Sequence, residues 1–214
     1  MKRGIIITLP RHDQVTEYLS QYSYQIEDAA NENGIEIKKL KDEEANREEF
    51  EKVMKKLDYK MVIFNGHGSA DSIDGNKKPI VKIGENEALL KERITYARSC
   101  HAALVLGREC MKDSKEGCFI GYDRPFQFYV NIQWTGSPLK DNVARLFLES
   151  SNLVPISIIK GNSTISAHEK SKRSTLKNIK KILRNKNEDS YLIAEGLWNN
   201  YLGQIVLGNE DIKL

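Results

Sequence analysis

The 214-residue chain has little of several features that would define a protein class. Its three cysteines, Cys100, Cys110 and Cys118, are an odd number without a CxxC pair, so neither a disulfide framework nor a structural zinc site is predicted. No apolar run reaches membrane-spanning length, and neither GxGxxG nor GxxxxGK(S/T) occurs, which argues against a phosphate-binding loop. The net charge of +3 is too small for the chain as a whole to bind polyanions.

The composition that remains is that of an ordinary globular protein, with 40% hydrophobic and 29% charged residues. The apolar run Ile5–Ile7 stops at once before Pro10 and a polar stretch, so it predicts a first strand and not a signal peptide. Free thiols and the missing leader together predict a cytoplasmic protein with no membrane partner. We expect one domain over 1–214, with a core sheet in 1–135 and a helical part in 136–214.

Strand-like and helix-like patterns alternate along the first half of the chain. Core strands are expected at 4–9, 35–40, 61–64, 94–97 and 118–122, with smaller ones at 80–83 and 204–207. Helices are expected from 15 to the Asn33-Gly34 pair, and at 42–56, 87–91, 102–106, 138–150, 167–185 and 190–201. This alternation predicts an α/β fold: a three-layer α/β/α sandwich around a mostly parallel sheet.

Two reactive side chains follow predicted strands of that sheet. His67 comes just after the third core strand and Cys100 just after the fourth. Ligands bind at the carboxyl ends of parallel strands, where neighbouring strands are about 4.8 Å apart. A thiol needs a base to become a thiolate, and histidine suits that task at neutral pH. A helix starting just after Cys100 would lower the thiol pKa further.

The segments around these residues resemble a known superfamily. One strand ends in the run Phe64 to Ser69 (Phe-Asn-Gly-His-Gly-Ser) and the next in Tyr96 to Ala102 (Tyr-Ala-Arg-Ser-Cys-His-Ala). The pair is similar to the caspase-like cysteine peptidases, which include caspases, metacaspases, legumain, clostripain, gingipain and bacterial CHAT domains. The Ser-Cys-His run is similar to the metacaspase nucleophile motif. The resemblance covers roughly residues 4–128.

The resemblance implies a caspase-like fold and a cysteine endopeptidase acting on protein or peptide substrates without a cofactor or metal. His67 would be the general base and acid, and Cys100 the nucleophile that forms a thioester. The backbone N–H groups of Gly68 and Cys100 would form the oxyanion hole. No third catalytic residue is required, and none is nominated.

Arg98 departs from the family pattern, since metacaspases carry Asp and caspases carry Gln two residues before the nucleophile. A guanidinium is a good partner for a carboxylate, so one hypothesis makes Arg98 part of an S1 pocket that prefers Asp or Glu at P1. The alternative is that Arg98 turns away to pair with an acid such as Asp123.

Other interpretations stay open beside the peptidase. The enzyme alternative is a related acyl-transfer activity, such as self-cleavage only. The non-enzyme alternative is a flavodoxin-like binding or signalling module whose cysteine and histidine are incidental. Residues 168–186 hold eight Lys or Arg and one acid, which favours a solvated helix face over a nucleic-acid patch. Asp71, Asp74 and Glu85 match no calcium-loop spacing. Cys110 and Cys118 are expected to be buried, His101 to pack or cap, and His12 and His168 to be solvated.

Overall fold

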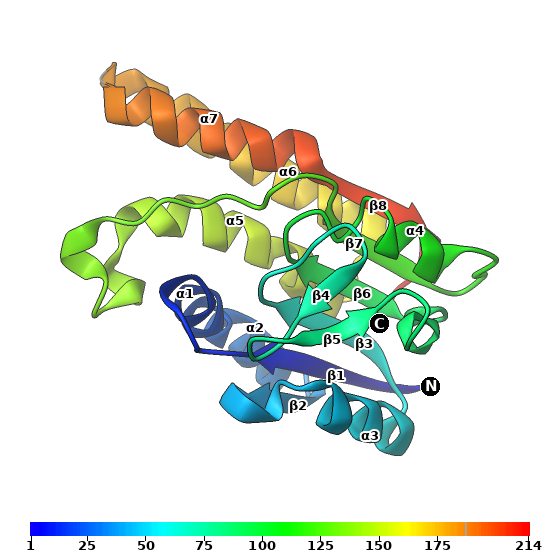
Figure 1. Cartoon of the computed structure of the whole chain (residues 1–214). Helices are drawn as coiled ribbons and strands as arrows, with labels where there is room; N and C mark the ends of the chain where they lie inside the picture. The colour runs from blue at the N-terminus through cyan, green and yellow to red at the C-terminus, as the bar shows by residue number, and fades with distance from the viewer. Residues whose placement is uncertain (187) are drawn as a thin grey trace.

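The structure is a computed structural model that describes residues 1–186 and 188–214. Its centre is a six-stranded sheet in the order β2-β1-β3-β6-β7-β8, parallel except for β8, which runs antiparallel to β7 (Figure 1). A separate antiparallel hairpin, β4-β5, follows β3 along the chain. The strands are β1 (Lys2–Leu9), β2 (Glu36–Lys41), β3 (Tyr59–Asn65), β4 (Ser72–Asp74), β5 (Pro79–Lys82), β6 (Ile94–Arg98), β7 (Cys118–Tyr122) and β8 (Gln204–Gly208).

Helices cover both faces of the sheet. Buried side chains of α2, α5 and α6 pack on one face, and those of α3, α4 and the β4-β5 hairpin pack on the other. The helices are α1 (Gln14–Tyr22), α2 (Tyr24–Glu32), α3 (Arg47–Leu57), α4 (Leu106–Met111), α5 (Asn142–Ile159), α6 (Thr164–Ile182) and α7 (Glu188–Gly203). Short 3-10 turns occur at Asp42–Glu44, Glu87–Leu90, Ile132–Trp134, Pro138–Lys140 and Leu183–Asn185. The predicted three-layer α/β/α architecture is confirmed.

The apolar runs of the sequence explain the strands. Ile5, Ile6 and Ile7 of β1 are all completely buried, as expected of a strand covered on both faces. No helix in the part of the chain that the structure describes is long and apolar enough to cross a membrane.

Four helix predictions need correction. The predicted helix at 42–56 is divided, since a 3-10 turn at Asp42–Glu44 is followed by α3, which begins at Arg47 after its N-cap Asn46. The first predicted helix is interrupted at Ser23, which separates α1 from α2. The predicted helix at 102–106 is wrong, because α4 begins only at Leu106. His101 has a left-handed φ of 58°, and Ala103 N–H donates to Tyr122 O, so this backbone is tied to the end of β7 instead. The 138–150 helix is preceded by a 3-10 turn, and Asp141 caps α5.

Arg98, the last residue of β6, is completely buried and joins three other elements. Its Nε donates to Asn65 Oδ1 at the end of β3 (2.7 Å), and its Nη1 to Asn152 Oδ1 in α5 (2.6 Å). Its Nη2 donates to Ser23 Oγ (2.8 Å) and to Leu19 O (3.2 Å) at the break between α1 and α2. Burial lowers the pKa of Arg98 from its ordinary value. We call these residues the Arg98 network.

We predict that Arg98→Met destabilises the chain. Methionine fills similar space but donates nothing, so buried acceptors on β3, α5 and the α1–α2 break lose their donor, at a cost of about 3 kcal/mol or more. Urea unfolding followed by circular dichroism measures this loss.

Arg108→Met is the matched control, because Arg108 lies exposed on α4. It should change the free energy of unfolding by no more than about 0.5 kcal/mol. Equal stability of the two variants would contradict the importance of the Arg98 network.

Candidate active site

His67 and Cys100 follow neighbouring strands, as predicted. β3 and β6 pair in parallel register, with Asn65 opposite Arg98 at the last paired position. Each reactive residue lies two positions beyond that pair in its own segment. The expectation that the two strands are parallel neighbours is therefore confirmed, and both segments leave the sheet at the same edge.

Two glycines let the backbone segments approach one another at this edge. A Cβ at Gly66 would overlap the Asp74 carbonyl oxygen of β4. A Cβ at Gly68 would lie 2.9 Å from Ser99 Cβ and 3.2 Å from Cys100 O. The second contact places the backbone next to His67 directly against the backbone of Cys100. Packing between backbone segments thus accounts for the Gly-His-Gly run.

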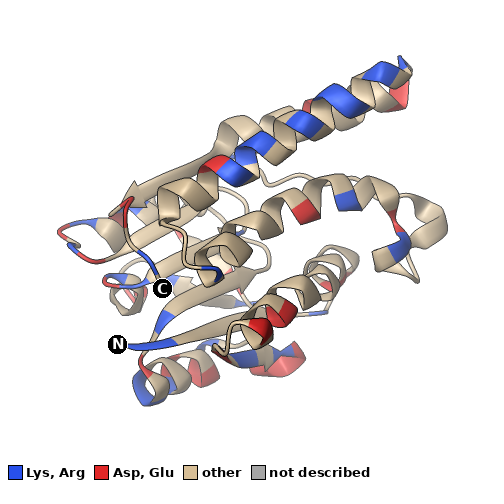
Figure 2. Ribbon diagram, turned by 180° about the vertical axis from the view of Figure 1, so that it is seen from behind, with Lys and Arg blue, Asp and Glu red and all other residues tan. Residues whose placement is uncertain are grey.

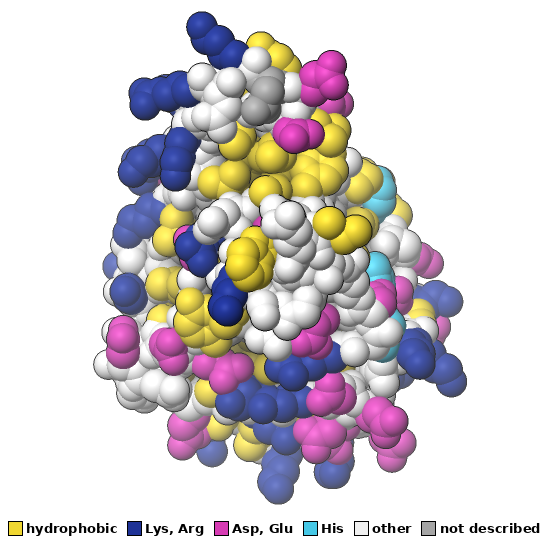
Figure 3. Space-filling view, turned by 90° about the vertical axis from the view of Figure 1, so that its left-hand side faces the viewer, with side chains coloured by type: hydrophobic (Ala, Val, Ile, Leu, Met, Phe, Trp, Pro, Cys, Tyr) yellow, Lys and Arg dark blue, Asp and Glu magenta, His cyan; other side chains and the backbone are white. Residues whose placement is uncertain are grey.

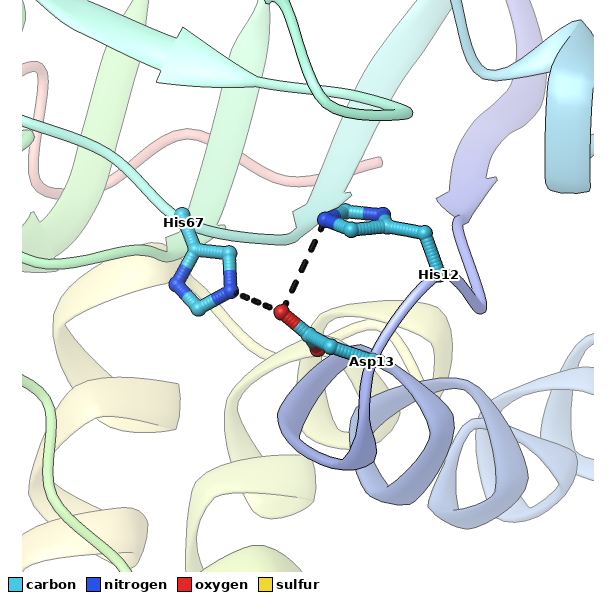
Figure 4. A group of neighbouring side chains, drawn as sticks. All are labelled: His12, Asp13 and His67. Atoms are coloured by element: carbon cyan, nitrogen blue, oxygen red, sulfur yellow. Dashed lines mark hydrogen bonds and ion pairs between the residues drawn. The ribbon is translucent and has the colours of Figure 1, made fainter.

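The His67 imidazole is held by Asp13, which is not among the site residues predicted from the sequence. His67 Nε2 lies 2.6 Å from Asp13 Oδ2, and the two side chains are 43% and 38% exposed (Figure 4). Asp13 is the N-cap of α1, and its Oδ1 accepts from Thr16 N–H at 2.8 Å. Thr16 Oγ1 in turn accepts from Asp13 N–H, which completes a capping box. The cap therefore fixes the carboxylate that holds His67.

The charge of Asp13 decides where the proton of His67 lies. Partial burial opposes ionisation, but hydrogen bonds from Thr16 N–H and from His67 outweigh it and lower the pKa of Asp13 to about 2. An ionised carboxylate can only accept, so His67 Nε2 carries the proton of this hydrogen bond. In the neutral ring the lone pair is then on Nδ1, the nitrogen that points away from Asp13 in Figure 4. This tautomer leaves Nδ1 free to accept a proton.

A signal for Asp13 was present in the sequence. Asp13 follows β1, and the carboxyl ends of parallel strands meet at one edge of a sheet. Its spacing to Thr16 also fits a helix cap. The sequence does not reveal that β1 and β3 are neighbours, and that pairing is what brings Asp13 to His67.

Cys100 is partly buried, and its Sγ lies 3.9 Å from Phe126 O. Burial raises the pKa of the Cys100 thiol. The expected lowering by a helix N-terminus is wrong, since residues 100–105 form turns and α4 starts later. At neutral pH the resting side chain is therefore a thiol. Any nucleophilic role requires a base that removes its proton.

The backbone N–H of Gly68 is oriented away from the neighbouring hairpin. Gly68 forms an isolated antiparallel bridge with Ile73, and the hydrogen bonds on either side are donated by Ser69 N–H and Asp74 N–H. In this pattern Gly68 is the non-hydrogen-bonded partner, so its own N–H points to the other side. Such a donor is available to an oxyanion.

The predicted role of Arg98 in an S1 pocket is wrong. Its side chain is completely buried, and its guanidinium is occupied by the Arg98 network. It therefore cannot meet a substrate carboxylate, and it does not pair with Asp123 either. Its place two residues before Cys100 suggested a binding role, whereas its hydrogen-bond partners come from β3, α5 and the α1–α2 break, which the sequence does not place together.

The remaining histidines and cysteines have mixed outcomes. Cys110 and Cys118 are buried as expected, and burial raises the pKa of each to about 12. His101 Nδ1 lies 3.3 Å from Asp123 O, in keeping with a packing role. The prediction that His12 and His168 are solvated is wrong: the His12 side chain is only 12% exposed, and burial lowers the pKa of His168 to about 4.

An apolar groove adjoins the segment that contacts Cys100. Phe126 belongs to the connection between β7 and α5, and the same connection continues into one wall of the groove. Figure 3 shows hydrophobic side chains gathered on this side of the molecule, with Lys and Arg along one edge. The groove has a volume of about 440 Å³ and is lined by Tyr129, Val130, Asn131, Ile132, Val143, Asp189, Leu192 and Ile193.

The basic residues of 168–186 lie elsewhere. They repeat along α6, on the upper edge of the molecule in Figure 2. A second groove there is lined by Arg173, Leu176, Lys177, Lys180, Lys181 and Arg184. It contains neither His67 nor Cys100, so this surface is separate from the candidate active site.

Comparison with known proteins supports the fold. No family model matches the sequence, and no curated protein matches it. Among solved structures the chain is similar to the Arg-specific cysteine proteinase gingipain R, with a TM-score of 0.57 at 10% identity. The match covers 99% of this chain and 47% of that one, so this chain spans about half of its length. At this identity the match supports the fold alone, which is a three-layer α/β/α fold like that of gingipain R.

We predict that Asp13→Asn changes the position of the His67 proton. Asparagine caps helices as well as aspartate, so the free energy of unfolding should stay within about 1 kcal/mol of the original. The amide has no charge to hold the proton on Nε2, so long-range ¹H–¹⁵N NMR should show a mixture of the two neutral tautomers.

Asp28→Asn makes the same substitution on the exposed surface of α2 and should leave the proton on Nε2. Retention of a single Nε2–H tautomer in Asp13→Asn would rule out this role of the carboxylate.

Proposed function

We propose that the chain is a cysteine endopeptidase with Cys100 as nucleophile and His67 as general base and acid. The observation that carries this proposal is the position of His67. Its Nε2 is fixed by Asp13, and it follows β3, the strand that pairs with β6, which leads to Cys100. The caspase-like fold and its likeness to a cysteine proteinase support it. Asp13 acts through His67 and is a positioning residue.

The proposed reaction begins with proton transfer from Cys100 Sγ to His67 Nδ1, since the resting thiol is protonated. The thiolate attacks the scissile carbonyl carbon, and the backbone N–H groups of Gly68 and Cys100 stabilise the resulting oxyanion. His67 returns the proton to the leaving amine as the C–N bond breaks, which leaves a thioester on Cys100. Water then hydrolyses the thioester, with His67 acting as base again.

In the resting chain, no hydrogen bond joins the His67 ring to Cys100 Sγ among the described residues. His67 Nε2 goes to Asp13, and Cys100 Sγ lies against Phe126 O. Catalytic hydrogen bonds are often long in free enzymes and shorten with substrate. The free Nδ1 is the nitrogen through which such a contact would form.

The substrate is proposed to be a protein or peptide, and the apolar groove beside the Phe126 segment is a candidate site for part of it. The P1 preference of this chain cannot be transferred from gingipain R, because the two sequences are only 10% identical and the match covers 47% of gingipain R. The acidic-P1 hypothesis loses its basis with the burial of Arg98. A specific relation to metacaspases or CHAT domains, the single-domain organisation over 1–214 and a cytoplasmic location remain our proposals.

We predict that Cys100→Ala and His67→Ala each lower the cleavage of a mixed-sequence peptide library at least about 1,000-fold, because nucleophile and base act as one unit. Mass spectrometry of the products measures the loss and reads the P1 residue from the new C-termini.

Cys110→Ala is the matched control, since it removes a buried thiol outside the site and should retain most of the cleavage. Circular dichroism checks that all variants fold. Undiminished cleavage by Cys100→Ala would contradict the mechanism. A chain that cleaves no library peptide would instead favour the non-enzyme alternative.

A further inference from the structure

We propose that His12, Asp13 and His67 bind one Zn²⁺ ion, and that this ion switches off the base of the candidate active site. The second part rests on the proposed function, whereas the first part does not. Neither the comparisons nor the sequence patterns assign a metal to this chain. The observation behind the proposal is the convergence of two imidazoles and one carboxylate at a single point (Figure 4).

The donor atoms lie at distances suited to a small cation. One donor atom from each of the three residues lies within 4.8 Å of the other two. Asp13 Oδ2 is 2.6 Å from His67 Nε2 and 3.6 Å from His12 Nε2. Tetrahedral zinc, with bonds of about 2.0–2.1 Å, separates its ligand atoms by roughly 3.3 Å. The 2.6 Å pair is joined by a proton, and replacing that proton with a metal requires it to open by less than about 1 Å.

The surroundings fit a bound cation reached from solvent. His67 and Asp13 are about two-fifths exposed, so an ion can enter, while His12 is mostly buried. His12 faces the cluster with Nε2, which lies 3.6 Å from Asp13 Oδ2. Its other nitrogen, Nδ1, is buried without a hydrogen-bond partner among the described residues.

The donor set selects the type of ion. Two imidazole nitrogens exclude Ca²⁺ and Mg²⁺ as preferred occupants, since both take oxygen ligands. Two histidines and one carboxylate form a common three-ligand zinc set that leaves a fourth position for water. The cluster is therefore assigned to Zn²⁺.

The ion would act on the tautomer of His67. Without metal, the Nε2 proton is held by Asp13 and the Nδ1 lone pair is free. A neutral imidazole that binds zinc through Nε2 carries its proton on Nδ1, so the ring exchanges its Nε2 proton for one on Nδ1 through solvent. Nδ1 can then no longer take a proton from Cys100. Bound zinc thus prevents His67 from acting as a base, although the ion does not bind the Cys100 thiol.

The first experiment measures Zn²⁺ binding to the 214-residue chain carrying Cys100→Ala by isothermal titration calorimetry. We expect one ion per chain, with ¹⁵N NMR showing His67 coordinated through Nε2 and protonated on Nδ1. His12→Gln in this background should weaken zinc binding at least about tenfold, because losing a ligand costs no less than losing an outer-shell partner. His168→Gln removes an imidazole on α6 and should leave the affinity unchanged. Absence of binding, or equal binding by His12→Gln, would overturn the site.

The second experiment measures peptide cleavage by the original chain and by His12→Gln, each relative to its own rate in chelator. Zinc should inhibit the original chain reversibly and at a concentration at least about tenfold lower than it inhibits His12→Gln. If zinc binds without lowering the cleavage rate, or if it raises that rate, the proposed inhibition through His67 is overturned. A chain that cleaves nothing would refute the proposed function, whereas the calorimetry would still decide the zinc site.

Discussion

The buried guanidinium of Arg98 is the constraint on which the candidate active site depends. Arg98 ends the strand that leads to Cys100, and it binds Asn65, which ends the strand that leads to His67. Its other hydrogen bonds reach the break between α1 and α2 and the middle of α5. Asn65 extends the connection to β1 by donating to Thr8 O at 2.7 Å. One side chain thus fixes the strand ends and the helices around them.

This arrangement explains how an exposed imidazole acquires a defined tautomer. β1 leads through Asp13 into α1, and the cap of that helix holds a carboxylate at the place where β3 delivers His67. A charged acceptor beside Nε2 keeps the proton there and leaves Nδ1 free. The same carboxylate, together with His12, provides donors for a cation. Activity and inhibition would therefore share His67 Nε2, which holds either a proton or zinc.

Local patterns in the sequence were sufficient for the fold and for the order of its strands along the chain. The apolar runs around Ile5–Ile7, Ile63 and Ile120 predicted the buried strands. The places of His67 and Cys100 just after two of these strands predicted that both lie at the same edge of the sheet. The roles of Arg98 and Asp13 did not follow, because their partners are distant in the sequence. The start of α4 at Leu106 was not predicted either, because the backbone of residues 101–103 forms hydrogen bonds with the end of β7 and the residues after it. What the sequence misses here are long-range polar contacts.

The most direct test of the account is covalent labelling of the intact chain with a mixed library of peptidyl chloromethyl ketones, read by peptide mass spectrometry. These reagents need a substrate-like position, a nucleophile and a working base. The account predicts one adduct per chain, on Cys100, with labelling that depends on His67 and is absent from His67→Ala. Labelling of Cys110 or Cys118 at the same rate as Cys100, or labelling of Cys100 that is unchanged in His67→Ala, would contradict it.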